Sequence, residues 1–337
     1  MTRSQTRVMP PADPLLAFVR MPFQQVFYPY GFPVQIKSNS QAILEAAEQS
    51  WGVSRQRFEE SAVQVNYLVC NGPKRSAPTP VFRAQSHLLT MVADAHNYAC
   101  GDLLRGFGSA WLTEAAINDT EYLRYTFLEG LVYVLLENLH LVAIHGACVV
   151  KDGHGVLLAA DSGMGKSSLA YACACRGWTY VSDDASALIR RGTGRKIIGN
   201  PQLFRFRPTA ADLFPELHRY GILESPLKAR FRKGKPTLEV RTDFLPHIQV
   251  AEEAAIDHVV FLNRDTQING SARLIPVSRE EALRRLLSGA WPSELPLHQQ
   301  GSAAIERLLG AELGELSYCD LEPAIDLLED VVRRGLS

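Results

Sequence analysis

The feature that most constrains the fold of this 337-residue chain is a glycine-containing turn between an apolar, strand-like stretch (residues 155–160) and a helix-compatible run (166–176). Residues 160–167 read Ala-Asp-Ser-Gly-Met-Gly-Lys-Ser and match the pattern GxxxxGK[ST] except at the first position, where Ala160 replaces glycine. A strand, such a loop and a helix in succession predict an α/β fold with a phosphate-binding loop. A chance glycine-rich turn is the competing interpretation, and the flanking strand and helix argue against it.

The residue types of this loop suit the binding of a nucleotide. Gly163 and Gly165 let the backbone N–H groups curl around phosphate oxygens, and the following helix N-terminus adds partial positive charge. Lys166 would reach the β and γ phosphates, and the Ser167 hydroxyl would ligate a Mg²⁺ ion bridging them. ATP and Mg²⁺ are therefore the predicted cofactors. The predicted nucleotide-binding residues are Asp161, Ser162, Gly163, Met164, Gly165, Lys166, Ser167 and Ser168.

Two adjacent aspartates, Asp183 and Asp184, follow the next strand-like stretch, residues 178–182. In a parallel sheet, their carboxylates would lie beside the loop at the carboxyl edge of the strands. One carboxylate at that place can hold Mg²⁺, and the other can accept the proton of an attacking hydroxyl. A solvated acidic turn is the alternative interpretation, because aspartate is common in turns.

Three stretches of the sequence together resemble the catalytic domain of bacterial HPr kinase/phosphorylase, with the spacing from Lys166 to Asp183 kept without a gap. The stretches are His145-Gly146 through Gly155-Val156-Leu157-Leu158, then Asp161-Ser162-Gly163-Met164-Gly165-Lys166-Ser167, then Arg176-Gly177-Trp178-Thr179-Tyr180-Val181-Ser182-Asp183-Asp184. The resemblance implies a P-loop core of the HPr kinase and phosphoenolpyruvate carboxykinase type. It also implies a kinase that phosphorylates a serine.

The resemblance assigns roles to individual residues. Lys166, Asp183 and His145 would be catalytic, with Asp183 as the general base and His145 near the transferred phosphate. Ser167 and Asp184 would bind the metal. The close match covers residues 144–185, with Ser168 where the family usually carries glutamate, and the family's EIRGxG signature has no convincing copy in this chain. HPr itself is therefore not the expected substrate.

The remaining segments predict two domains after a tail. Residues 1–14 form a predicted disordered tail, residues 15–120 a smaller N-terminal α+β domain of unknown role, and residues 121–337 the HPr kinase-like catalytic domain. A long buried helix over 121–141 would begin that domain. Further on, Asn269 and Gly270 predict a hairpin turn, and helices are expected over 279–287 and 321–334.

Composition limits the partners that can be expected. The chain has 35 Lys and Arg against 36 Asp and Glu, so no global field would draw it to nucleic acid or to an anionic membrane. The six cysteines lack CxxC pairs and are interpreted as reduced core thiols. No apolar run is long enough to span a bilayer, and no signal segment is recognisable, which predicts a cytoplasmic protein. The family resemblance suggests a homo-oligomer.

Two basic features have an open interpretation. Arg205 and Arg207 alternate with Phe204 and Phe206, so on a strand both guanidinium groups would share one face. They could clamp phosphate or an acidic substrate, or form a solvated face. A run of five cations could close over the nucleotide, grip a partner or be plain solvated surface; it consists of Lys228, Arg230, Arg232, Lys233 and Lys235.

Together these observations predict an ATP- and Mg²⁺-dependent kinase that transfers the γ-phosphoryl group to a hydroxyl. The acceptor stays open among a protein, a precursor peptide and a small molecule. Two alternatives stay open. The missing family signature and the unassigned N-terminal domain favour an ATP-binding regulatory module, and a nucleotide hydrolase that uses water as the acceptor is a further possibility.

Overall fold

The computed structural model describes residues 19–183, 186–207, 210–219, 230–232, 235–265, 270–288 and 298–336. It is a mixed α/β protein with several sheets, and the chain divides into two compact units, Met1–Leu136 and Glu137–Ser337. The predicted tail, Asp184, the turn residue Asn269, and Lys228 and Lys233 of the basic run lie outside the described residues. None of the helices in the described ranges combines the length and apolar character needed to cross a membrane.

The first unit is built on a seven-stranded sheet with the order β1-β2-β3-β7-β6-β5-β4. Its strands are β1 (Phe23–Phe27), β2 (Val34–Ser38), β3 (Val63–Cys70), β4 (Val81–Gln85), β5 (Leu88–Val92), β6 (Tyr98–Asp102) and β7 (Phe107–Thr113). Its helices are η1 (Pro29–Gly31), α1 (Gln41–Trp51), α2 (Glu114–Asn118), α3 (Thr120–Tyr122), the π-helical η2 (Leu123–Leu128) and α4 (Glu129–Leu139), which continues into the second unit.

Helix α4 packs closely on the sheet of the first unit. A Cβ atom on Gly101 of β6 or Gly108 of β7 would lie 3.2–3.5 Å from methyl groups of Leu131 and Leu135. Both leucines are fully buried. Glycine at these two strand positions therefore gives the helix room to approach the sheet.

The second unit contains a ten-stranded mixed sheet and a small three-stranded sheet. Its strands are β8 (Leu141–Ile144), β9 (Gly146–Lys151), β10 (His154–Ala159), β11 (Thr179–Ser182), β12 (Ser186–Ile189), β13 (Lys196–Ile198), β14 (Leu203–Phe206), β15 (Arg230–Arg232), β16 (Lys235–Arg241), β17 (Gln249–Val250), β18 (Glu253–Arg264), β19 (Ala272–Pro276) and β20 (Glu312–Tyr318). Its helices are α5 (Lys166–Cys175), α6 (Ala210–Leu213), α7 (Glu216–Arg219), η3 (Thr242–Phe244), α8 (Arg279–Ser288), α9 (His298–Leu308) and α10 (Leu321–Arg334).

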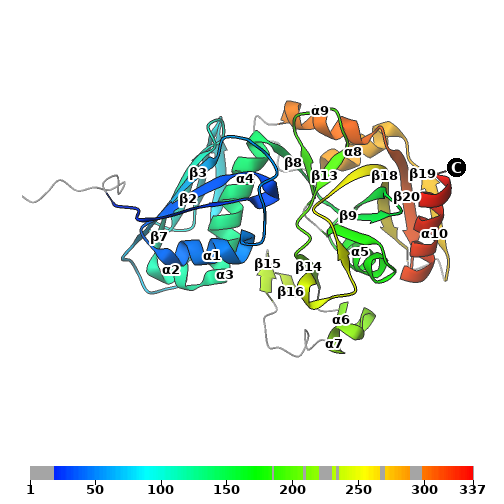
Figure 1. The fold of residues 1–337 in the computed structure, drawn as a ribbon, viewed down its shortest axis with the longest axis horizontal. Helices are drawn as coiled ribbons and strands as arrows, with labels where there is room; N and C mark the ends of the chain where they lie inside the picture. Colours follow the sequence, from blue (N-terminus) through cyan, green and yellow to red (C-terminus); the bar gives the residue numbers. More distant parts are fainter. Residues whose placement is uncertain are drawn as a thin grey trace, which may run out of the picture. The chain divides into compact units, whose positions relative to one another are not determined.

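Helices cover both faces of the large sheet, and each face has its own apolar core (Figure 1). On one face, Leu169 of α5 and Leu328 of α10 pack with Val156 of β10. On the other face, Leu286 of α8 and Leu308 of α9 pack with residues such as Leu157. Because successive side chains of a strand point to opposite faces, neighbouring residues of β10 serve the two different cores.

Most elements of the second unit agree with the sequence predictions. The terminal helix has the predicted bounds, and the helix after the glycine loop begins at the predicted Lys166. The predicted hairpin around Asn269 and Gly270 is wrong, because β19 pairs with β20 and β20 lies between β18 and β19. The interpretation of the cysteines as core thiols holds for Cys148 and Cys173, whereas the other four are partly or fully exposed; all six are free.

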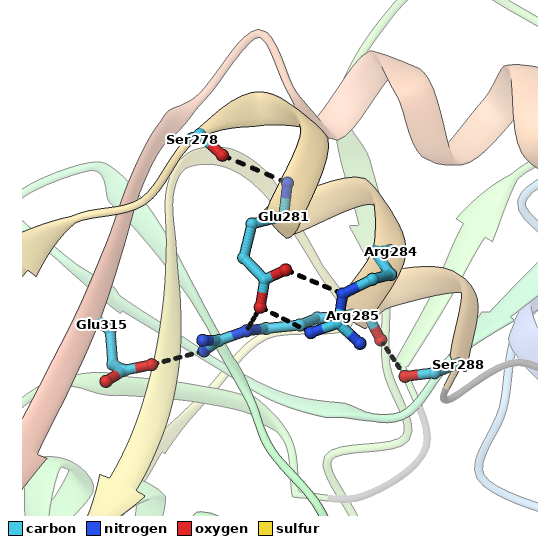
Figure 2. Close-up of polar contacts among 6 residues, drawn as sticks. All are labelled: Ser278, Glu281, Arg284, Arg285, Ser288 and Glu315. Atoms are coloured by element: carbon cyan, nitrogen blue, oxygen red, sulfur yellow. Dashed lines mark hydrogen bonds and ion pairs between the residues drawn. The ribbon is translucent and has the colours of Figure 1, made fainter.

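A network of ion pairs connects α8 to β20 (Figure 2). Glu281 accepts hydrogen bonds from Arg284 Nε (2.7 Å) and Arg285 Nε (2.6 Å), and these bonds lower the pKa of Glu281 to about 2. Arg285 also donates through Nη1 to Glu315 of β20 (2.5 Å). Its guanidinium carbon lies 5.3 Å from the ring centroid of Phe261. Arg285 therefore connects the helix to the sheet, whereas the bonds of Arg284 stay within α8.

We expect Arg285→Ala to lower the free energy of unfolding by about 1 kcal/mol, because it removes a partly buried ion pair and a cation–π contact. The matched variant Arg284→Ala removes only an exposed pair within one helix and should leave stability nearly unchanged. Chemical denaturation of both variants measures the difference. Equal losses would contradict the role of Arg285 as the connection between α8 and β20.

Candidate functional site

The ends of three segments meet at one edge of the large sheet. Strand β9 lies between β10 and β11 and is antiparallel to both, so β10 and β11 run parallel to each other. The last residue of β10, Ala159, pairs with Gly146, the first residue of β9, and Ser182 at the end of β11 pairs with Cys148. The glycine loop (residues 160–167), His145 and Asp183 therefore begin at the same sheet edge. The sheet is mixed rather than parallel, and Asp183 of the predicted acidic pair follows a strand that ends at this edge.

The glycine loop adopts backbone conformations that require its two glycines. Gly163 has φ 97° and Gly165 has φ 92°, in the left-handed region that costs other residues energy. Gly165 is the N-cap residue of α5, so Lys166 is the first helical residue. The loop therefore ends where the unpaired N–H groups of a ten-residue helix are available to an anion.

The Lys166 side chain lies inside the curve of the loop and is only 5% exposed. Its ammonium group donates to the carbonyl oxygens of Ala160 (2.7 Å) and Asp161 (3.2 Å) and contacts His145 Nε2 at 3.0 Å. Because an ammonium group has only donors, we assign Nε2 of His145 as an acceptor, which places the proton of a neutral ring on Nδ1. The structure thus brings together Lys166 and His145, which are 21 residues apart in sequence.

A buried pair of serines connects the end of β11, next to Asp183, to the start of β12. Ser186 Oγ donates to the carbonyl oxygen of Gly146 (2.8 Å) and lies 2.6 Å from Ser182 Oγ. Ser186 has one hydroxyl hydrogen, so Ser182 is the donor in the bond between the two serines. Both serines are 1% exposed. These hydrogen bonds therefore connect the end of β11 and the start of β12 to Gly146, the residue that follows His145.

Asp183 is itself 3% exposed and its Oδ2 accepts a hydrogen bond from the backbone N–H of Arg205 (2.5 Å). A charge-assisted bond of this kind stabilises a carboxylate. The second aspartate of the pair, Asp184, lies outside the described residues. The predicted role of Asp184 in metal binding therefore stays a prediction.

Arg205 in β14 and Arg207 just after β14 have different surroundings. The Arg205 side chain is 14% exposed, and its Nε pairs with Glu239 of β16 at 3.2 Å. Arg207 is exposed, and its Nη2 lies 3.4 Å from Ser162 Oγ of the glycine loop. Beneath them, Phe204 and Phe206 are buried against Tyr171 of α5. The structure places Arg205 within β14 but Arg207 beyond its end, and Arg207 contacts the loop.

Sequence reasoning missed Ser182 and Ser186, and it missed Tyr318, whose hydroxyl donates to the carbonyl oxygen of Met164 in the loop (3.1 Å). It also did not predict the pairing of Glu239 with Arg205. The single available signal was the strand-end position of Ser182 next to Asp183. For Tyr318 no local signal exists, because 154 residues separate it from Met164.

No family model and no curated protein matches the chain, whereas solved structures do. One similar solved structure is the HPr(Ser) kinase/phosphatase from Coxiella burnetii, with 15% sequence identity over 57% of this chain and 93% of that chain, at a TM-score of 0.28.

We expect Ser186→Ala to lower the free energy of unfolding by about 1–2 kcal/mol, because it leaves the buried Ser182 hydroxyl and the Gly146 carbonyl without their partner. Urea denaturation monitored by fluorescence measures the change. Ser288→Ala is the matched control, since the Ser288 hydroxyl also donates to a carbonyl, that of Arg285, but at an exposed site. A loss at Ser186 no larger than at Ser288 would contradict the importance of the serine pair.

Proposed function

We propose that this protein binds ATP with Mg²⁺ at the glycine loop and transfers the γ-phosphoryl group to a hydroxyl. The observation that carries the proposal is one cluster at the sheet edge. The buried Lys166 ammonium group lies at the N-terminus of α5 and contacts His145. At the same edge, the buried Asp183 directly follows β11, which pairs with β9. A lysine, a helix N-terminus and an acid at one edge are the parts that phosphoryl transfer uses.

In this proposal the loop and Lys166 bind the polyphosphate. The ammonium group donates to the carbonyl oxygens of Ala160 and Asp161, and it would exchange these two carbonyl oxygens for phosphate oxygens when ATP binds. The exchange replaces neutral acceptors by charged ones, which makes stronger hydrogen bonds. His145 then stays beside Lys166, near the phosphate that is transferred.

The residues of the site fit a magnesium ion in donor chemistry. Mg²⁺ prefers oxygen ligands and is usually bound by one or two carboxylates together with substrate phosphates. Ser167, half-buried at the start of α5, offers a hydroxyl, and the acidic pair offers carboxylates. When bound, the ion would neutralise charge on the phosphates. We propose Ser167 and Asp184 as its ligands from the protein.

Asp183 is the proposed general base. The hydrogen bond from the Arg205 N–H to Oδ2 orients the carboxylate, which would accept the proton of the attacking hydroxyl. The hydroxyl belongs to a protein, a precursor peptide or a small molecule. The family resemblance favours serine.

We expect Asp183→Asn to lower the rate of phosphoryl transfer by about 100-fold or more, because a general base contributes about 10²–10⁴ to rate. Affinity for ATP should change little, and the amide oxygen can still accept from the Arg205 N–H. The assay incubates the protein with Mg²⁺, γ-labelled ATP and a panel of serine peptides and hydroxylated metabolites. Asp243→Asn, which alters an exposed aspartate paired with Arg241, is the matched control.

The same assay separates the alternatives. Transfer that persists in Asp183→Asn would show that another group is the base. Steady release of phosphate that a saturating acceptor does not reduce would indicate a hydrolase. Tight binding of ATP with no phosphorylated product from any acceptor would indicate a regulatory module.

We expect Arg207→Ala to weaken ATP binding by about three- to tenfold, because its guanidinium lies at the loop and would contact phosphate through a charge-assisted hydrogen bond. AMP, which lacks the β and γ phosphates, should bind both proteins alike. Isothermal titration calorimetry measures both nucleotides, and Arg334→Ala, an exposed arginine at the end of α10, controls for the loss of one positive charge. A uniform loss for ATP and AMP would place Arg207 away from the terminal phosphates.

A further inference from the structure

Tyr318 is the last residue of β20 and lies at the same sheet edge as the glycine loop. Strand β20 runs parallel to β18, and β18 runs parallel to β10, so the three strands end on the same side. The Tyr318 side chain is 1% exposed, and burial raises the pKa of its hydroxyl to about 12. The hydroxyl is therefore a protonated donor throughout the physiological pH range.

The Tyr318 hydroxyl donates to the carbonyl oxygen of Met164 at 3.1 Å. That carbonyl belongs to the peptide group that also contains the N–H of Gly165, and this peptide is trans. In a trans peptide, the C=O and N–H bonds point in opposite directions. A hydroxyl that holds the Met164 carbonyl on one side therefore turns the Gly165 N–H to the other side.

The approach of Tyr318 also limits what can stand at position 165. A Cβ atom on Gly165 would lie 2.6 Å from the Tyr318 oxygen but 3.8 Å from the ring carbon that bears it. The hydroxyl thus occupies the space against the loop. It contacts the peptide where the loop turns into α5, at Gly165 with φ 92°.

We propose that Tyr318 is a positioning residue of the phosphate-binding loop: by holding the Met164 carbonyl, it fixes the Gly165 N–H toward the bound polyphosphate. The inference rests on the proposed function. A glycine peptide has little intrinsic preference between orientations, so an external hydrogen bond is needed to select the one that binds phosphate. Tyr318 supplies that bond from a strand end that is distant in sequence.

The test uses Tyr318→Phe in the full chain, which removes the hydroxyl and keeps the buried ring. Calorimetric titration with Mg²⁺–ATP should show binding about two- to tenfold weaker, the equivalent of one hydrogen bond. Tyr67→Phe is the matched control. Tyr67 is also buried, and its hydroxyl donates to a backbone carbonyl, that of Phe127 in the first unit (3.2 Å). That variant should lose stability without losing ATP affinity.

A spectroscopic readout separates positioning from plain stabilisation. In protein labelled with [¹⁵N]glycine and free of nucleotide, the Gly165 amide resonance should shift or broaden in Tyr318→Phe, while that of Gly101 in the first unit stays in place. A merely structural role of Tyr318 would lower the unfolding temperature and leave both the Gly165 resonance and the ATP affinity unchanged, and that result overturns the inference. Failure of the unmodified protein to bind ATP would instead overturn the proposed function and, with it, the inference.

Discussion

The organisation of the site depends on the hydrogen bonds of the buried Lys166 ammonium group. Burial of a charge is costly unless hydrogen bonds replace its water. The Lys166 ammonium group has three N–H donors, and the groups that it contacts include the carbonyl oxygens of Ala160 and Asp161 and Nε2 of His145. The loop therefore curls around its own lysine, and the bonds from Lys166 to the carbonyl oxygens of Ala160 and Asp161 stabilise the loop conformation.

The position of β9 explains how the other parts of the site reach that lysine. A single antiparallel strand between β10 and β11 puts both of their carboxyl ends beside its own beginning, where His145 and Gly146 lie. The hydrogen bond from Ser186 to Gly146 connects the start of β12 to the start of β9. One short strand thus supplies the geometry for the loop, the histidine and the acid together.

Local patterns in the sequence were enough to predict the elements that interact with near neighbours. The glycine loop needs only its own backbone and the helix after it, and the terminal helix is amphipathic over its whole length, so both were predicted well. The hairpin prediction failed because β20, which comes about 40 residues later, takes the place between β18 and β19. The contacts of Ser186 with Gly146 and of Tyr318 with Met164 span 40 and 154 residues, and no local signal marks either of them.

Arg205 and Arg207 have identical side chains but different contacts, so we expect them to have different roles. Arg205 lies within β14, opposite Glu239 across the β14–β16 pair, and the two form a partly buried ion pair. Arg205 is therefore committed to holding β14 on β16, and its backbone N–H is placed for Asp183. Arg207, beyond the end of that pairing, keeps an exposed charge at Ser162, where a phosphate group would need it.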